Sequence, residues 1–381
     1  MTHKIPKSAI VLSGGGARAA YQVGALKAVY ECVPKGNLHP FPIICGSSAG
    51  AINAASIACY SGQIRAGIRR LESIWANLTV EQVFRGDLAG MLKQTMGFIW
   101  HVMSGHNPSR LNALLDNSPL RELLTKSIPF KRLDKLIDDG ILQALCISCS
   151  DYYSGDTYSF YQGNQQLPEW HRHRRLGVAD DINIDHLMAS SAIPLIFPAV
   201  NIDSQYFGDG SVGFMSPISP AIHLGAEKIL IIGLDPNIEK PGVICYDKPP
   251  PSFVDVAGHV LNSVFIDSLD SDLERLERIN TLLNSVPESL MLEANLPLKT
   301  IETLVISPSV ELSELAVDCG KHLPSTSRFF LSRLGINCDE GSNMLSYLLF
   351  DGHYCRRLID LGYKDTINKK EQLKSFLDSY N

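Results

Sequence analysis

Apolar residues follow two periods along this chain, one typical of buried strands and one typical of helices. The runs SAIVLS at 8–13 and FPIICGS at 41–47 are short and apolar, which predicts buried strands. After the glycines at 14–16, apolar residues recur at every third or fourth position, which predicts a helix. A second predicted helix, rich in alanine, follows the strand at 41–47 directly. Strand, turn and helix therefore occur twice in succession.

The middle of the chain continues this alternation. Residues 62–140 mostly carry the apolar spacing of helices. Further strands are predicted at 141–150, at 156–163 and at 227–235, each of which is a short run of apolar or β-branched residues. Five prolines then fall within 235–252, and this density predicts a linker or a wandering surface segment.

Beyond these prolines the sequence predicts a long helix and one more strand, at 302–309. We expect the apolar stripe of the helix to lie on the main sheet, and a heptad partner is the alternative. Strands that alternate with helices predict an α/β fold, a three-layer α/β/α sandwich on a mostly parallel central sheet. We expect a core over 8–235, with the linker, long helix, added strand and C-terminal helices of 236–381 packed on the same domain.

Composition and charge narrow the class of protein. The 381 residues are 45% hydrophobic and 19% charged, which is typical of a globular protein. The net charge of −6 argues against a nucleic-acid partner. There is no run of about 18 apolar residues, as a membrane span requires, and no apolar run typical of a signal peptide. The nine scattered cysteines indicate a reducing compartment. We therefore expect a cytoplasmic protein with, at most, peripheral membrane contact.

Two patterns have the spacing of metal sites, and neither fits one. Cys146 and Cys149 lie in a predicted strand, where residues three apart point to opposite faces, so they cannot chelate one ion. The acidic stretch ADDINIDHL at 179–187 has calcium-loop spacing. However, His186 occupies the obligatory glycine position of such a loop and Ala192 its closing acidic position. We predict no metal and no other cofactor.

The stretch ICGSSAGA at 44–51 contains the strongest chemical signal. Gly46, Ser48 and Gly50 match G-x-S-x-G at a predicted junction of strand and helix, where a nucleophilic serine sits on a strained turn. Small flanking residues let neighbouring backbones approach this turn closely. The alternative is a turn of small residues that is packed tightly and has no chemical role. The strand-to-helix context favours the nucleophile.

A serine nucleophile needs N–H donors for the oxyanion of its tetrahedral intermediate. Ala49, next after the serine, is one natural donor, and the loop Gly14-Gly15-Gly16 can supply others. Arg18 follows this loop and either holds it in place or binds an anionic group of the substrate. A nucleotide cradle is the rival interpretation, but no lysine of a P-loop follows and no acidic residue ends the next strand.

The base is harder to find, because none of the later histidines lies in a loop that looks catalytic. These histidines are His223, His259, His322 and His353. Asp209 is a better candidate, since the glycines beside it in FGDG allow a close approach to another backbone. A plain Asp-Gly turn is the alternative for Asp209.

Four segments in this order resemble one family. They are SGGGARAAYQVGAL, GSSAGA, ASSAIPLIFPAV and FGDG. Together, over about residues 8–235, they resemble the patatin-like phospholipases, lipid acyl hydrolases with a Ser–Asp dyad and no catalytic histidine. The resemblance implies that Ser48 is the nucleophile, that Asp209 is the base and that the glycines at 14–16 form the oxyanion loop. It also implies a phospholipid or lysophospholipid substrate.

This sequence departs from the family pattern at two positions. Ala19 stands where the family often has glycine, and it stiffens the start of the helix. Ser211 replaces the usual small residue after Asp-Gly, and its hydroxyl can bond to Asp209 and lower its basicity. Burial beside the apolar run at 194–200 would raise the pKa of Asp209 in compensation.

Two segments suggest how a lipid reaches the site. The apolar run MLKQTMGFIWHVM at 91–103 is either a lid that contacts the membrane or a core helix. The run EWHRHRR at 169–175 is either a docking patch for lipid phosphates or a solvated surface loop. An acyl hydrolase is the function that we expect. The alternative is a lipid- or partner-binding module on the same fold with little or no hydrolase activity.

Overall fold

The structure is a computed structural model of the chain. It describes residues 7–33, 39–85, 113, 115–212, 216–236, 253–287, 298–321, 323, 328 and 343–378. Within 253–268 it describes the backbone, and only His259 of the side chains. The apolar run at 91–103 and His322 lie outside the described residues.

One sheet contains the ten strands of the described residues, in the order β10-β9-β1-β2-β3-β4-β6-β5, and β8 also pairs with β3 while β7 pairs with β8. Neighbours from β10 to β3 run parallel. The strands are β1 Ser8–Leu12, β2 Ile43–Ser47, β3 Ala144–Asp151, β4 Thr157–Gly163, β5 Trp170–Arg172, β6 Arg175–Ala179, β7 Val200–Ile202, β8 Gln205–Asp209, β9 Lys228–Ile232 and β10 Glu302–Ile306.

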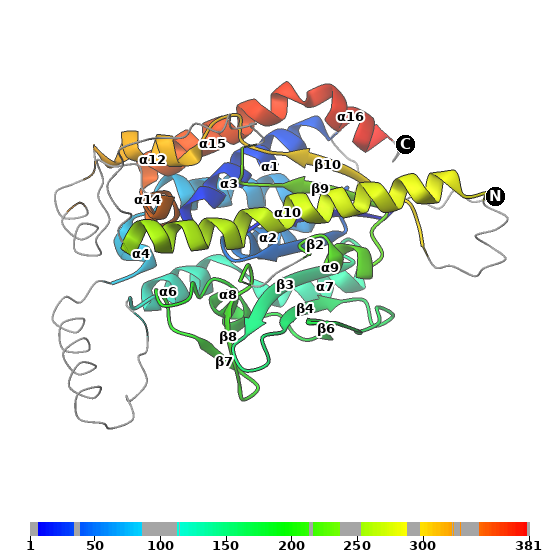
Figure 1. Ribbon diagram of the computed structural model, residues 1–381, viewed down its shortest axis with the longest axis horizontal. Helices are drawn as coiled ribbons and strands as arrows, with labels where there is room; N and C mark the ends of the chain where they lie inside the picture. The colour runs from blue at the N-terminus through cyan, green and yellow to red at the C-terminus, as the bar shows by residue number, and fades with distance from the viewer. Residues whose placement is uncertain are drawn as a thin grey trace.

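Helices cover both faces of this sheet. The α-helices of the described residues include α1 Ala20–Cys32, α2 Ala49–Ala58, α3 Ile64–Ala76, α4 Val80–Val83, α6 Ser118–Ser127, α7 Leu133–Asp138, α8 Ile184–Ser190, α9 Ser219–His223, α10 Phe253–Ser285, α12 Leu312–Gly320, α14 Asn343–Leu348, α15 Gly352–Asn368 and α16 Lys370–Asp378. One core cluster contains apolar residues of α1, α2, α3, α6 and α15, and a second contains those of α9 and α10. Figure 1 shows α10 crossing the sheet. The predicted three-layer α/β/α sandwich is therefore confirmed.

The strands align at one edge because of their register. Leu12 at the end of β1 pairs with Gly46 of β2 on one side and with Ile232 of β9 on the other. Asp209 ends β8 opposite Cys149 near the end of β3. The glycine loop after β1, the turn after β2 and the end of β8 therefore meet at one edge of the sheet, as is usual for ligand sites in α/β folds.

The late part of the chain packs on the early part. β10 pairs with β9 in parallel, and α15 lies side by side with α1, as Figure 1 shows. Gly24 of α1 and Gly362 of α15 permit this close crossing: a Cβ on Gly24 would meet the backbone oxygen of Ile359, and a Cβ on Gly362 would meet that of Tyr21. The division of the chain near residue 235 stays a prediction.

Several local predictions can be compared with the structure. A short 3-10 turn at Gly16–Ala19 precedes α1, so the regular helix begins at Ala20, after the glycines as predicted. Cys146 and Cys149 are free and belong to the core clusters on opposite faces of the sheet, as predicted. None of the described helices combines the length and the apolar character that a bilayer crossing needs.

Candidate active site

The turn between β2 and α2 holds Ser48 in a strained conformation. Its φ is 52° and its ψ is −132°, in a region of backbone angles that residues other than glycine rarely adopt. The neighbouring glycines are needed for space: a Cβ on Gly46 would meet the backbone oxygen of Gly50, and a Cβ on Gly50 would meet the backbone oxygen of Leu12. This turn has the form of a nucleophile elbow, in which a sharp strand-to-helix turn directs the serine hydroxyl to one side.

The hydroxyl of Ser48 points at the carboxylate of Asp209. Ser48 Oγ donates a hydrogen bond to Asp209 Oδ2 at 2.6 Å, and both side chains are buried, with exposed fractions of 1% and 0%. The contact joins residues 161 positions apart in the chain. Such a short hydrogen bond between a hydroxyl and a buried carboxylate is the geometry that general-base activation requires.

Burial controls the proton affinity of Asp209. The loss of solvent raises the pKa of its carboxyl from 3.8 to about 7, against the opposite effect of hydrogen bonds from Ser48 and from both the N–H and the hydroxyl of Ser211. The N–H of Ser211 donates to Asp209 Oδ1 at 2.8 Å. Ser211 therefore lowers the pKa of Asp209, the direction predicted from its hydroxyl. A base with a pKa near neutrality suits hydrolysis at neutral pH.

A third serine, Ser190, connects the turn of Ser48 with the turn of Asp209, and we did not predict it as a site residue. Ser190, the last residue of α8, accepts a 2.9 Å hydrogen bond from the N–H of Ser48 and donates a 2.6 Å hydrogen bond to the backbone oxygen of Ser148. Its own backbone oxygen accepts from the N–H of Gly210 at 3.0 Å. A second backbone hydrogen bond joins the same two segments, since the N–H of Asp209 donates to the oxygen of Ala192.

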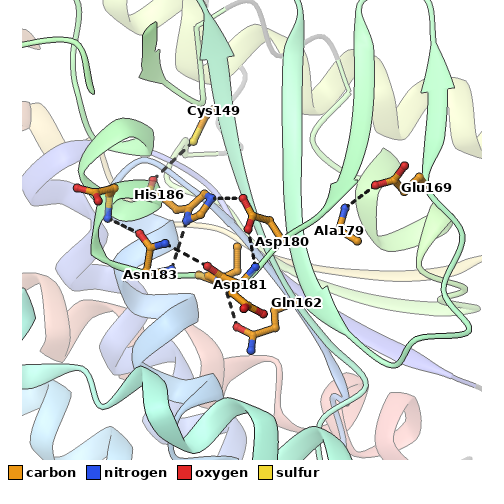
Figure 2. A network of polar contacts seen from close by, with 10 residues as sticks. Cys149, Gln162, Glu169, Ala179, Asp180, Asp181, Asn183 and His186 are labelled. Atoms are coloured by element: carbon orange, nitrogen blue, oxygen red, sulfur yellow. Dashed lines mark hydrogen bonds and ion pairs between the residues drawn. The ribbon is translucent and has the colours of Figure 1, made fainter. Parts of the chain in front are cut away.

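The histidine closest in sequence to Ser190 is fixed by other partners. His186 Nε2 lies 3.2 Å from Asp180 Oδ2, and its Nδ1 accepts from the N–H of Asn183 (Figure 2). Burial lowers the pKa of this imidazole despite the nearby carboxylates. With both ring nitrogens engaged, His186 holds the start of α8 and is not placed to act on Ser48. The side chain of Asn183 caps the same helix by accepting from the N–H of Asp185, so the stretch with calcium-loop spacing is a helix cap.

The histidines considered from the sequence are also placed for other contacts. His223 stacks on Trp170, with ring centroids 4.9 Å apart, and burial and two nearby arginines lower its pKa to about 4. His353 lies in the first turn of α15, where its N–H donates to Asp351. His259 is an exposed residue of α10. None of the described residues forms a group of three side chains that could hold a metal ion.

The predicted oxyanion donors divide between two cavities. Gly16 and Ala49 line the same cavity as Ser48. Gly14 and Gly15 line a second cavity on the other side of the loop. Gly16 has a φ of 54°, and a Cβ there would meet the backbone oxygen of Tyr347, so this position requires glycine. The loop therefore forms a thin wall between Ser48 and the second cavity.

Arg18 is buried behind this loop, with an exposed fraction of 4%. Its Nε donates to Ser346 Oγ at 2.8 Å, its Nη1 donates to the hydroxyl of Tyr347 at 3.2 Å, and its guanidinium lies 4.0 Å from the centre of that ring. These contacts attach the glycine loop to α14. Substrate binding by Arg18 stays a prediction.

The cavity at Ser48 is narrow and apolar. Its volume is about 50 Å³, and the side chains that line it beside Ser48 include Ile193, Phe197 and Phe350. Further along, it is lined by residues of α2, α3 and α6. An apolar cavity beside a nucleophile is typical of a site for a hydrocarbon chain.

The predicted docking run at 169–175 is only partly available to a partner. Trp170 is buried in a stack between Tyr161 and His223, so it cannot enter a membrane. Arg172 and Arg174 are exposed. Arg175, at the start of β6, pairs with Thr157 at the start of β4, and Thr157 in turn pairs with Ser150 near the end of β3. The arginines therefore lie at the same edge of the sheet as Ser48.

Comparisons with known proteins identify the family. The family model described as Patatin-like phospholipase matches residues 10–222. Among solved structures, VipD from Legionella pneumophila is 13% identical, with a TM-score of 0.32, and the match covers 94% of this chain and 67% of that chain. ExoU from Pseudomonas aeruginosa, in complex with SpcU, is 16% identical, with a TM-score of 0.29 and coverage of 91% and 70%. A search of curated proteins finds no match. Because the family model matches more than half of the chain, the protein belongs to the patatin-like phospholipase family.

Proposed function

We propose that this protein is a serine acyl hydrolase that cleaves fatty-acyl esters of phospholipids or lysophospholipids. The observation that carries the proposal is the 2.6 Å hydrogen bond from Ser48 Oγ to Asp209 Oδ2 at a strained turn. The apolar cavity beside Ser48 supports a substrate with a hydrocarbon chain. Membership of the patatin-like phospholipase family supports a lipid substrate.

The reaction has two steps, with Asp209 as the proton carrier in both. In the first, Ser48 Oγ attacks the acyl carbonyl carbon and gives its proton to Asp209, and the ester C–O bond breaks as the alcohol leaves with that proton. In the second, water gives a proton to Asp209 and attacks the acyl-enzyme, and Ser48 recovers the proton as the fatty acid departs. Buried and with a pKa near 7, Asp209 can accept and return protons at neutral pH.

The oxyanion of each tetrahedral intermediate needs N–H donors that are in place before the reaction. Gly16 and Ala49 line the cavity beside Ser48, so their N–H groups are the first candidates, with Gly14 and Gly15 next along the loop. The N-terminus of α2 adds a favourable dipole, because Ser48 immediately precedes its first residue, Ala49. In this proposal, attack and charge stabilisation take place at the same turn.

Active-site labelling tests this function. We expect a fluorophosphonate probe to add once to the wild-type chain and not to Ser48→Ala, as measured by intact mass. The matched control is Ser8→Ala, since Ser8 is a buried serine whose hydroxyl donates to the oxygen of Pro40. Equal labelling of wild type and Ser48→Ala would contradict the assignment. Hydrolysis should also continue in excess EDTA, because every proton transfer uses Asp209; a loss restored by calcium alone would contradict this.

A further inference from the structure

The cavity at Ser48 is an elongated tube, because each of three helices lines it with one stripe. On α2 the stripe is Ala49, Ile52 and Ser56. α3 contributes Leu71, Ile74 and Trp75, and α6 contributes residues spaced by three and four within 120–127. Positions with this spacing lie above one another on one face of a helix. The tube therefore runs along the helices and not across them.

Two of the three helices, α2 and α6, start at the Ser48 end of the cavity. α2 begins directly after Ser48. The start of α6 is at the same end. Leu115, three residues before α6, donates its N–H to the backbone oxygen of Ile196, and the nearby Ile193 and Phe197 line the cavity beside Ser48. α3 runs in the opposite direction, since Arg70 at its far part donates to the backbone oxygen of Lys126 near the end of α6. Ser56, Leu71 and the end of α6 therefore share the far end of the tube.

Two helices give the same length for this tube. From Ala49 to Ser56 on α2 and from Leu120 to Ser127 on α6 the stripe spans seven helical steps, or about 10 Å at about 1.5 Å per residue. An extended chain advances about 1.2 Å per single bond, because a residue of three bonds spans about 3.5 Å. About 10 Å therefore holds an acyl chain of roughly eight to ten carbons, with its carbonyl carbon at Ser48.

The end and the bore of the tube restrict the chain further. Hydroxyl groups stand at the far end of two stripes, those of Ser56 and Ser127, and the hydroxyl of Ser56 donates to the oxygen of Ile52. The cavity volume of about 50 Å³ is well below the roughly 150 Å³ of an apolar cavity that takes up benzene, so an acyl chain enters only when the walls of the tube widen. Such a narrow bore favours an unbranched chain. We expect the partly exposed side chains of Ile74 and Leu123 to move outward when a chain enters.

We propose that the substrates of this enzyme carry a medium-length, unbranched acyl chain, of about eight to ten carbons, held in the tube that ends at Ser56 and Ser127. The inference rests on the proposed function, because it takes Ser48 as the point of acyl transfer. The tail of a longer chain would extend beyond the apolar walls of the tube, so its extra methylenes would contribute no further affinity.

Titration of the product acids into the Ser48→Ala protein measures the tube without catalysis. We expect affinity to increase about fourfold for each added carbon from hexanoate to decanoate, the factor for burial of one methylene, and to stay level for dodecanoate and hexadecanoate. In the wild type, kcat/KM for the matching monoacyl esters should peak at the same length. Affinity that keeps rising to hexadecanoate, or no binding of any acid, would overturn the proposal.

Variants at the far end give an independent check. Ser56→Leu should weaken decanoate binding at least about tenfold and leave hexanoate binding within about twofold, since the new side chain replaces roughly two methylenes of the chain. Leu71→Ala should shift the optimum toward dodecanoate. The control is Ser73→Leu, because Ser73 is exposed on the outer face of α3. An unchanged length profile in both far-end variants would overturn the proposal. If acids bind as expected but Ser48 takes up no probe, the hydrolase function fails and the tube does not.

Discussion

Ser190 accepts a 2.9 Å hydrogen bond from the backbone N–H of Ser48. Because the same hydroxyl donates to the backbone oxygen of Ser148, it ties the strained turn to the neighbouring strand β3. The backbone oxygen of Ser190 also holds Gly210, next to Asp209. One residue of α8 thus fixes the distance between the proposed nucleophile and its base, and we regard it as a positioning residue.

Replacement of Ser190 by alanine should lower kcat by about 10- to 100-fold with little change in KM, since a displacement of about 1 Å at the reacting groups can cost that much. The rate of fluorophosphonate labelling should fall in parallel. Ser190→Thr keeps a hydroxyl and should recover part of the rate. Ser8→Ala removes a comparable buried hydrogen bond elsewhere and should leave kcat unchanged. A Ser190→Ala enzyme with full kcat would show that the contact is only structural.

Asp209→Asn should change activity and stability in opposite directions. Turnover should fall by about 10²-fold or more, because the amide cannot accept the proton of Ser48. Since burial raises the pKa of Asp209 from 3.8 to about 7, the folded chain binds this proton more tightly than the unfolded chain, and the free energy of unfolding falls as pH rises from about 4 to 7. At pH about 8 the variant should therefore be more stable than the wild type, with a free energy of unfolding that is higher by about 4 kcal/mol at most. Thermal unfolding at two pH values measures this; a variant destabilised at both would contradict the buried charge.

The pH profile of kcat/KM should show one rising limb with a midpoint near 7. Asp209 must be deprotonated to accept a proton, and the pKa of its carboxyl is raised to about 7 by burial. His223→Asn should leave this limb in place, since the pKa of that imidazole is about 4 and its ring stacks on Trp170. A midpoint near 4, or a limb that disappears with a histidine, would contradict the role of Asp209.

Arg18→Lys distinguishes a residue that holds the loop from one that binds substrate. Lysine keeps the charge but loses the planar group that contacts both Ser346 and Tyr347. If Arg18 holds the loop, kcat should fall about tenfold and the melting temperature should fall, with KM for neutral and anionic lipids changed alike. An increase of KM for anionic lipids alone would instead support substrate binding. Arg65→Lys is the control, because Arg65 bonds to the oxygens of Tyr30 and Val33 away from the site.

The exposed arginines at the catalytic edge should contribute to membrane contact. Replacing Arg172, Arg174 and Arg175 with glutamine should weaken binding to phosphatidylserine vesicles by about 10²-fold, at about 1 kcal/mol for each charge near an anionic surface. Hydrolysis of a soluble short-chain ester should be spared. Lys131, Arg132 and Lys135, changed to glutamine together, provide a control with the same loss of charge, because the segment 130–138 leads into the start of β3, at the other end of the strands. Equal vesicle binding by the arginine variant and the wild type would make 169–175 a plain surface segment.

Periodicity alone predicted much of the fold, because the buried strands β1 and β2 are short apolar runs that end at glycines or serines. The flanking glycines marked Ser48 and Asp209 separately as positions of close approach, and the resemblance of four segments to the patatin-like phospholipases implied their pairing. The bend of the chain that brings them within 2.6 Å could not be derived from either motif alone.

Ser190 shows why other site residues were missed. Its partners are 142 and 42 positions away, and its contacts are to backbone groups, which leave no residue-type signal at those positions. The tube was missed for a related reason, since a stripe such as 120–127 on α6 has the spacing of any helix that packs on a core. Trp170 led to an incorrect expectation of surface exposure, because an aromatic residue beside arginines suggests a docking patch. Its ring instead completes a buried stack with Tyr161 and His223.

The close crossing of α1 and α15, with Arg18 attached to α14, also has a consequence for the timing of activity. The ribosome releases Ser48 and Asp209 first, while the helices of 343–378 that hold the glycine loop follow at roughly 10–30 s, at 5–20 residues per second. We expect a nascent chain to carry both reactive groups without a firm oxyanion loop. We therefore expect the proposed hydrolase activity to appear only after the helices of 343–378 have packed on the glycine loop.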